Sequence, residues 1–318
     1  METDIRALND LSWGYRASRV LQVANGLGIF TMLSEGKKSA GQISEKCRSK
    51  GELTEKLLIG CAAMGLLEKE GGLYRNSELA KKYLVRGEKL YQGDMIAHSA
   101  NVMEFWNRLE DEIRIEDKRG DKGAEEHKNF IMGMDNIAAA GRAQMFVDRI
   151  DLSGRRKLFD VGGGPGSYSI AACKRYRQLK AVVFDLPETI AIAKQVIADE
   201  GMQERVSVKE GNWQTDSFGE GSDVILLSNV LHGPGSGAEL KLEKARDCLE
   251  AGGLLVVQDF LLNDEKSGPL IPALFNIMVG TYSEGELLSL IKRAGFVSCE
   301  IVMASEEIGG SWIIAERP

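Results

Sequence analysis

Apolar residues in the first hundred positions recur at helical spacing. The segments ASRVLQVANGLGIFTML (17–33) and ELTEKLLIGCAAMGLL (52–67) carry apolar side chains every three or four positions, which predicts two helices. Between them, SAGQISEKC (39–47) predicts a short helix with Ser39 as its N-cap. The following segment EKEGGLYRNS (68–77) places a Gly-Gly turn between two short polar-apolar stretches, which predicts a hairpin.

Three helices followed by a small hairpin are the order of a winged helix, a fold that often binds DNA through its third helix. Recognition of bases and phosphates requires Arg, Lys, Asn or Gln on that helix. Here the helix is mostly apolar, with Leu57, Leu58, Ile59, Cys61, Ala62, Ala63 and Met64. We therefore expect this half to pack against protein, as a homodimer contact, and not against nucleic acid.

From about residue 150, short apolar runs alternate with helical stretches. The runs are 156–163, 180–186, 206–212, 223–230, 254–261, 296–304 and 311–317. Continuously apolar strands separated by helices predict an α/β fold with a parallel sheet covered on both faces. Because only a short link joins the last two runs, we expect the final strand to be antiparallel. The charged segment 105–130 is expected to form a helix and an exposed loop in which His127 is solvated.

Composition narrows the functional classes. The chain has 318 residues, a length that suits two domains, and a net charge of −7, which disfavours non-specific nucleic-acid binding. It has no apolar run long enough to span a membrane, and its polar start is unlike a signal peptide. We expect a cytoplasmic protein with no nucleic-acid or membrane partner. The five cysteines form no CxxC pair or Cys/His cluster, so we predict no metal site.

A glycine-rich turn follows the first predicted strand, in LFDVGGGPGSYS (158–169). Ligands of doubly wound sheets bind at the carboxyl ends of strands, where glycine lets the backbone approach closely. The dinucleotide pattern GxGxxG fits poorly, because its last position falls on Ser167 or Ser169. The pattern D-x-G-x-G-x-G, the first motif of S-adenosylmethionine-dependent methyltransferases, fits better, with Asp160, Gly162, Gly164 and Gly166.

Two further strand ends support this cofactor. Asp185 ends the second strand, where its carboxylate can accept both ribose hydroxyls; the alternative is a turn residue before Pro187. After the third strand comes GNWQ (211–214), in which Trp213 can stack on adenine and Asn212 can hydrogen-bond the purine. The alternative for Trp213 is a place in the core. Together the three strand ends predict S-adenosylmethionine over a dinucleotide.

With these motifs, the chain resembles the two-domain O-methyltransferases that include plant caffeic acid, flavonoid and acetylserotonin methyltransferases. The resemblance covers nearly the whole chain and includes LSNVLHGPG (227–235) and GGLLVVQDFLLNDEKSGPL (252–270). It implies a Rossmann-like class I methyltransferase sheet, mostly parallel, preceded by a helical winged-helix dimerisation domain. The implied domains are a homodimerisation domain, a helical connector that contributes to an acceptor pocket, and a catalytic domain that binds S-adenosylmethionine, at 1–100, 101–150 and 151–318.

The resemblance also implies roles for individual residues. His232 falls on the family's general base, and Asp259 on the acid that orients it, which is usually glutamate. Because aspartate is one methylene shorter, we expect it to reach the imidazole only through water or a shifted backbone. The implied cofactor-binding residues are Asp160, Gly162, Gly164, Gly166, Asp185, Leu186, Gly211, Asn212, Trp213 and Ser228. The implied acceptor-pocket residues are Phe130, Met134 and Met278.

The sequence departs from the family after the base, where Gly233 replaces an aspartate and no tryptophan follows. A hydroxyl acceptor is a poor nucleophile until it loses its proton, and an imidazole with a pKa of about 6.5 suits that task. We predict methylation of a hydroxyl on a small aromatic or polycyclic acceptor, with His232 as base. The alternatives are a C-, N- or S-methyltransferase in which His232 is non-essential, and a non-catalytic regulatory dimer. His98 is expected to pack between helices or to reach the acceptor.

Overall fold

The computed structural model describes residues 5–114, 122–305 and 310–318, which divide into two compact units. The first unit comprises residues 1–118 together with 262–283, and the second comprises 119–261 together with 284–318. The segment 262–283 therefore belongs with the amino-terminal elements, although it lies within the carboxyl-terminal half of the sequence. No helix in the described ranges is long and apolar enough to cross a membrane.

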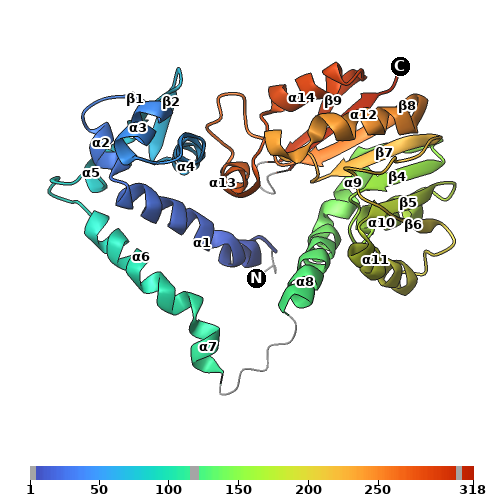
Figure 1. Cartoon of the computed structure of the whole chain (residues 1–318), viewed down its shortest axis with the longest axis horizontal. Coiled ribbons are helices and arrows are strands. Elements are labelled where there is room, and N and C mark those ends of the chain that lie inside the picture. The colour runs from blue at the N-terminus through green and yellow to red at the C-terminus, as the bar shows by residue number, and fades with distance from the viewer. Residues whose placement is uncertain (1–4, 115–121, 306–309) are drawn as a thin grey trace. The chain divides into compact units, whose positions relative to one another are not determined.

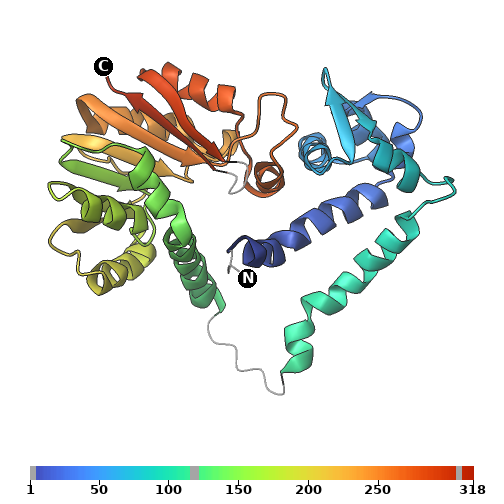
Figure 2. The same ribbon diagram turned by 180° about the vertical axis from the view of Figure 1, so that it is seen from behind.

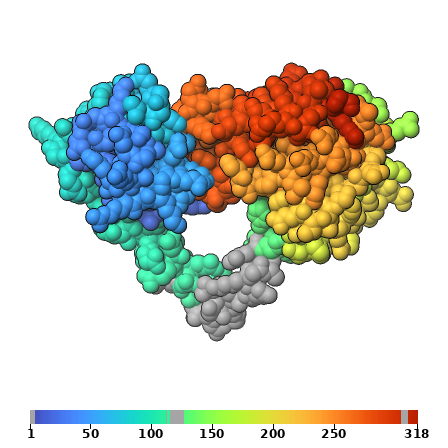
Figure 3. Space-filling model, turned by 45° about the horizontal axis from the view of Figure 1, so that its top comes forward, coloured from blue at the N-terminus to red at the C-terminus, as the bar shows by residue number. Residues whose placement is uncertain are grey.

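The first unit is helical with a small sheet of order β1-β3-β2 (Figure 1). Its elements are α1 (Ile5–Gly26), α2 (Ile29–Leu33), β1 (Lys38–Ser39), α3 (Ala40–Cys47), α4 (Gly51–Ala63), β2 (Leu67–Glu70), β3 (Leu73–Asn76), α5 (Glu78–Tyr83), α6 (Gly93–Asn107), α7 (Leu109–Ile113) and α13 (Leu270–Val279). On the face seen in Figure 3, the amino-terminal elements, coloured blue to cyan, form most of this unit's surface.

The predicted helices of this unit are present, with corrected limits. The helix expected over 17–33 is two helices, because Gly28 adopts a left-handed φ of 68° between them. The Ser39 cap is confirmed: its hydroxyl oxygen accepts a hydrogen bond from the Gln42 backbone N–H, and the Ser39 backbone N–H donates one to the Gln42 side-chain oxygen. The helix expected to reach residue 67 ends at Ala63, where the turn into the predicted hairpin begins.

The core of the first unit forms where the apolar faces of α1, α2 and α4 meet β3. Leu58, Cys61 and Tyr74 are fully buried there, beside Phe30. The apolar third helix is thus buried inside its own unit. His98 lies on α6 and is exposed, so it does not pack between helices as expected.

The second unit is built on a seven-stranded sheet of order β6-β5-β4-β7-β8-β10-β9 (Figure 2). Its elements are α8 (Lys122–Ile137), the π-helix η1 (Ala138–Arg142), α9 (Ala143–Arg149), β4 (Lys157–Val161), α10 (Ser167–Arg175), β5 (Lys180–Asp185), α11 (Pro187–Asp199), β6 (Val206–Glu210), β7 (Ser222–Ser228), η2 (Pro234–Ser236), α12 (Ala238–Cys248), β8 (Leu249–Asp259), α14 (Glu284–Arg293), β9 (Val297–Ser305) and β10 (Gly310–Glu316).

The sheet confirms the predicted topology. Strands β4 to β8 are mutually parallel, and the final strand β10 runs antiparallel between β8 and β9. Within the sheet the chain starts at the interior strand β4, builds β5 and β6 on one side, and then crosses to β7 and β8 on the other. The order therefore reverses next to β4, which places the switch point where β4 and β7 end.

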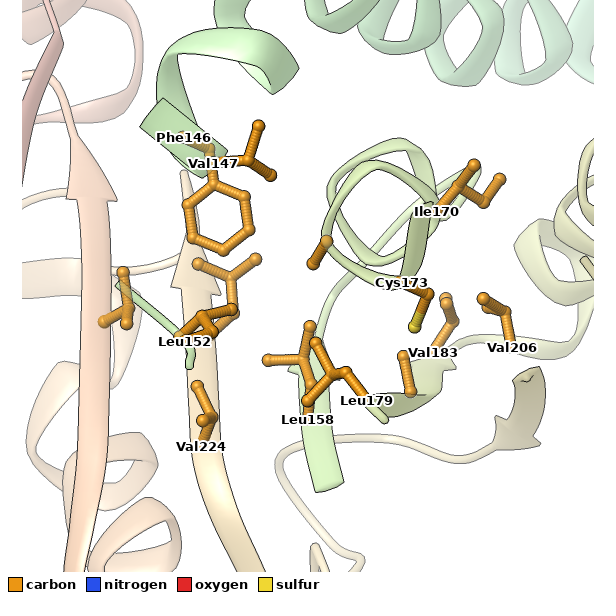
Figure 4. Packing of buried hydrophobic residues seen from close by; sticks show 14 of the residues in the cluster. Phe146, Val147, Leu152, Leu158, Ile170, Cys173, Leu179, Val183, Val206 and Val224 are labelled. Atoms are coloured by element: carbon orange, nitrogen blue, oxygen red, sulfur yellow. The ribbon is translucent and has the colours of Figure 1, made fainter. Parts of the chain in front are cut away.

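The strands of this unit are buried on their apolar faces, as continuous apolar runs predict. Figure 4 shows Leu158, Val183 and Val224, from neighbouring strands, in one cluster with Leu179 and Ile170. Aromatic side chains extend this core, since the rings of Phe146 and Trp312 stack with centroids 5.2 Å apart.

The charged connector departs from expectation at His127. This residue lies on α8 and is partly buried, with Nε2 3.3 Å from the hydroxyl oxygen of Thr189. The expectation of a solvated His127 is wrong because α8 packs against α11, which carries Thr189. Part of the predicted loop, 115–121, lies outside the described residues.

Candidate active site

The glycine-rich turn joins the end of β4 to the start of α10. Gly162, Gly164 and Gly166 have φ values of 65°, 55° and 86°, a left-handed region that L-side chains rarely adopt. The Gly162 amide donates a hydrogen bond of 2.7 Å to the carbonyl of Phe184 on β5. A Cβ at Gly162 would lie 2.7 Å from a methyl carbon of Val230. The turn thus needs glycine both for its backbone conformation and for its packing.

Asp160 is a buried acid directly beneath this turn. Its Oδ2 accepts a hydrogen bond of 2.7 Å from the Ser169 hydroxyl, while its Oδ1 is buried with no partner among the described residues. Burial raises its pKa to about 7; the Ser169 bond opposes this shift, and the charge of Asp185 adds to it. A buried carboxylate oxygen without a donor suits a cationic ligand group, such as the ammonium group of an amino acid.

Asp185 lies at the end of β5, beside the turn. Its two carboxylate oxygens accept backbone hydrogen bonds from Gly164 at 2.9 Å and from Leu186 at 2.8 Å. Burial raises the pKa of Asp185, and these two backbone bonds act in the opposite direction. Because each oxygen can accept a second hydrogen bond, the fixed carboxylate suits a vicinal diol.

The GNWQ turn follows β6 at the same edge of the sheet. The Gly211 amide donates to the Asp185 carbonyl at 3.0 Å, so this turn is tied to the end of β5. The Asn212 side-chain oxygen accepts from the Gln214 amide at 2.8 Å, which leaves its NH₂ group for a ligand. Trp213 is half-buried, and the Lys241 ammonium lies 3.6 Å from its ring centroid.

His232 and Asp259 form a direct pair at the ends of β7 and β8. His232 Nδ1 lies 2.8 Å from Asp259 Oδ1. Asp259 is buried and also accepts backbone hydrogen bonds from Leu231 and Phe260, at 3.0 and 2.8 Å. The expectation that aspartate reaches the ring only indirectly is wrong, because the adjacent parallel strands bring the two residues to one edge. A carboxylate accepts at Nδ1, so the neutral ring carries its proton there and Nε2 is the acceptor.

Comparison with known proteins identifies the family. Residues 115–297 match the O-methyltransferase domain, and residues 9–86 match the O-methyltransferase dimerisation domain. This chain belongs to the O-methyltransferase family. The match to the dimerisation domain supports a homodimer formed through the amino-terminal half.

Relatives of this methyltransferase span its whole length. It is 31% identical to a 3-hydroxy-5-methyl-1-naphthoate 3-O-methyltransferase of Streptomyces sahachiroi over 91% of this chain and 88% of the relative. An O-methyltransferase family 2 protein from Planctomyces limnophilus, solved with apigenin, has 27% identity and a TM-score of 0.83, covering 100% and 97% of the two chains. Human N-acetylserotonin methyltransferase, solved with S-adenosylmethionine, has 25% identity and a TM-score of 0.56, covering 100% and 98%. The cofactor of this methyltransferase is S-adenosylmethionine.

Two lysines of the methyltransferase that the sequence did not single out hold the loops of this site. Lys241 on α12 is buried and donates to the carbonyls of Val230 and Ser236, on either side of His232. Burial lowers its pKa to about 8, against the opposing charge of Asp259. One turn later, Lys244 donates to the carbonyls of Trp213, Gln214 and Asp216, at 2.8, 3.1 and 2.9 Å.

The remaining predicted site residues of the methyltransferase lie in different places. Ser228 ends β7 and donates to the Gln258 side chain at 2.9 Å. Phe130 and Met134 lie one turn apart on α8 of the second unit, and Phe130 is 61% exposed. Met278 lies on α13 of the first unit. The predicted acceptor-pocket residues are therefore divided between the two units.

Proposed function

We propose that this methyltransferase methylates a hydroxyl group of a small aromatic or polycyclic acceptor, with His232 as general base. The observation that carries the proposal is the 2.8 Å contact between His232 Nδ1 and the buried carboxylate of Asp259. The relatives add support, because a hydroxynaphthoate and apigenin are both hydroxylated polycyclic molecules.

The proposed cofactor contacts follow the three strand ends. Asp160 and the turn through Gly162 and Gly164 hold the amino-acid part, and Asp185 accepts the ribose hydroxyls. Leu186, Gly211, Asn212, Trp213 and Ser228 complete the predicted set. When bound, S-adenosylmethionine supplies a methyl group on a sulfonium, whose leaving group is already activated. The protein therefore has to align the acceptor, an effect worth roughly 7–11 kcal/mol, and remove its proton.

Proton removal is assigned to Nε2 of His232. Because Asp259 holds the Nδ1 proton, the lone pair of Nε2 is available to the acceptor hydroxyl. Once the imidazole is protonated, the Asp259 carboxylate stabilises its charge. Base catalysis of this kind contributes roughly 10²–10⁴-fold to a rate.

The test is His232→Ala, with Asp199→Ala as control, because Asp199 is exposed on α11. We expect kcat for a phenol acceptor to fall by about 10²–10³-fold in His232→Ala, since the base is lost. The dissociation constant of S-adenosylmethionine, measured by calorimetry, should remain unchanged, and Asp199→Ala should retain full rate.

Two other outcomes favour the other functions. Retained turnover in His232→Ala would indicate a carbon, nitrogen or sulfur acceptor. Tight cofactor binding without methyl transfer to any phenol or quinone tested would indicate a non-catalytic regulatory dimer.

A further inference from the structure

The first unit contains an apolar pocket of about 450 Å³ between α1, the start of α4 and α13. In both ribbon views α4 lies beside α1 and α13 (Figures 1 and 2), and α1 meets α13 through the rings of Trp13 and Phe275. The walls include Val20, Val23, Leu57, Leu274, Phe275 and Ile277. This volume lies within the range of roughly 300–1,000 Å³ typical of pockets for small molecules, and mostly apolar walls suit aromatic rings.

The charged residues that line this pocket are all cations. They are Arg16, Arg19 and Lys50, and no aspartate or glutamate lines the pocket. In the part of the chain that the structure describes, none of the three forms an ion pair with a carboxylate; Arg19 donates instead to the Gln22 side chain at 3.3 Å. In a chain of net charge −7, such a local excess of positive charge selects an anionic ligand.

Arg16 is held in place by aromatic rings. Its guanidinium carbon lies 4.6 Å from the ring centroid of Phe275 and 5.4 Å from that of Trp13, and its Nε donates to the Tyr15 hydroxyl at 3.4 Å. A cation–π contact attracts the charge to the ring face and uses none of the guanidinium's N–H groups as hydrogen-bond donors, so they are left for other partners. Those groups match the two oxygens of a carboxylate.

We propose that this pocket binds a small aromatic carboxylate, with its rings against the apolar walls and its carboxylate on Arg16 and Lys50. The inference stands apart from the proposed function, because the pocket is lined by the first unit alone, whereas His232 and Asp259 belong to the second.

The experiment compares 3-hydroxy-2-naphthoate with 2-naphthol by calorimetry, using the full chain without cofactor. A charged hydrogen bond contributes about 1.5–3 kcal/mol, so we expect the naphthoate to bind at least about tenfold more tightly. That preference should fall as salt is added and disappear in Arg16→Met, while 2-naphthol affinity stays within about twofold. The control is Arg75→Met, since Arg75 is exposed and paired with Glu68 on the hairpin of the same unit.

Equal affinity for the two probes, or an unchanged preference in Arg16→Met, overturns the proposal. So does weaker dimerisation of Arg16→Met in sedimentation with unchanged naphthoate binding, which would assign the pocket to a second copy of the chain. If Arg16→Met does not fold, Lys50→Met provides the same comparison, because Lys50 is exposed. The measurement involves neither cofactor nor turnover, so its failure leaves the test of His232 intact.

Discussion

Asp160 combines complete burial with a carboxylate oxygen that has no hydrogen-bond partner among the described residues. Its pKa of about 7 makes its charge variable near neutrality. The ammonium group of the cofactor's amino-acid part favours the ionised form, so cofactor binding and ionisation of Asp160 should be linked.

We therefore expect S-adenosylmethionine to bind more tightly as pH rises from about 6 to about 8. The folding stability depends on pH with the opposite sign. In the folded protein Asp160 keeps its proton up to about pH 7, whereas in the unfolded chain it loses the proton near pH 4. The free energy of unfolding of the cofactor-free protein should therefore fall between about pH 4 and 7, by at most about 1.4 kcal/mol per pH unit. Calorimetry and denaturant unfolding of Asp160→Asn should show neither dependence. Asp199→Asn, an exposed change, should keep both, and a dependence that survives in Asp160→Asn would refute the linkage.

Sequence reasoning located most of these residues because a parallel sheet brings the carboxyl ends of its strands to one edge. Asp160, Asp185, His232 and Asp259 all lie at or just after such ends. The direct contact of Asp259 with the imidazole could not be predicted, because side-chain reach depends on strand register. Only the structure fixes that register, pairing Ser228 with Gln258.

At the scale of elements, α12 connects the two loops that border the site. Lys241 holds the loop around His232, and Lys244 holds the turn that follows β6. Both lysines donate to backbone carbonyls, which every residue has. The sequences of the two loops therefore give no sign of these contacts. The sequence therefore predicts α12 only as one of the helices that separate the strands.

Variants of the two lysines should differ in their effects on kcat and on the KM for S-adenosylmethionine. Removing the donor from partly buried carbonyls costs about 1–3 kcal/mol, so we expect Lys241→Met to lower kcat by about tenfold; because its ammonium also lies on the Trp213 ring, the KM for S-adenosylmethionine should rise as well. Lys244→Met should raise that KM and leave kcat largely unchanged. Steady-state kinetics of both variants provides the measurement. An identical pattern in the two would show that α12 acts only on overall stability.

At the scale of the whole molecule, large apolar side chains remain exposed on two helices of the first unit. Leu11 on α1 is 84% exposed, and Met95 and Trp106 on α6 are each 63% exposed. Exposed apolar surface of this kind marks protein interfaces, and the match to the dimerisation domain includes Leu11.

We expect Leu11→Glu to shift the protein from dimer to monomer, because a charge buried in an apolar interface is costly. Sedimentation velocity over a range of concentrations measures the shift. The matched change Leu240→Glu, on the second unit, should leave the dimer unaffected. A Leu11→Glu protein that remains dimeric would place the interface elsewhere.

The segment 262–283 belongs to the first unit but is synthesised after most of the second unit. Its helix α13 packs on α4, where Ile277 approaches Gly60 and Ala273 is buried with Ile59. The ribosome synthesises residues 119–261 before this helix. Until α13 is made, the side of α4 that it covers remains exposed in the amino-terminal unit. Neither unit corresponds to a single uninterrupted stretch of the gene, and one cut in the chain cannot yield both of them complete.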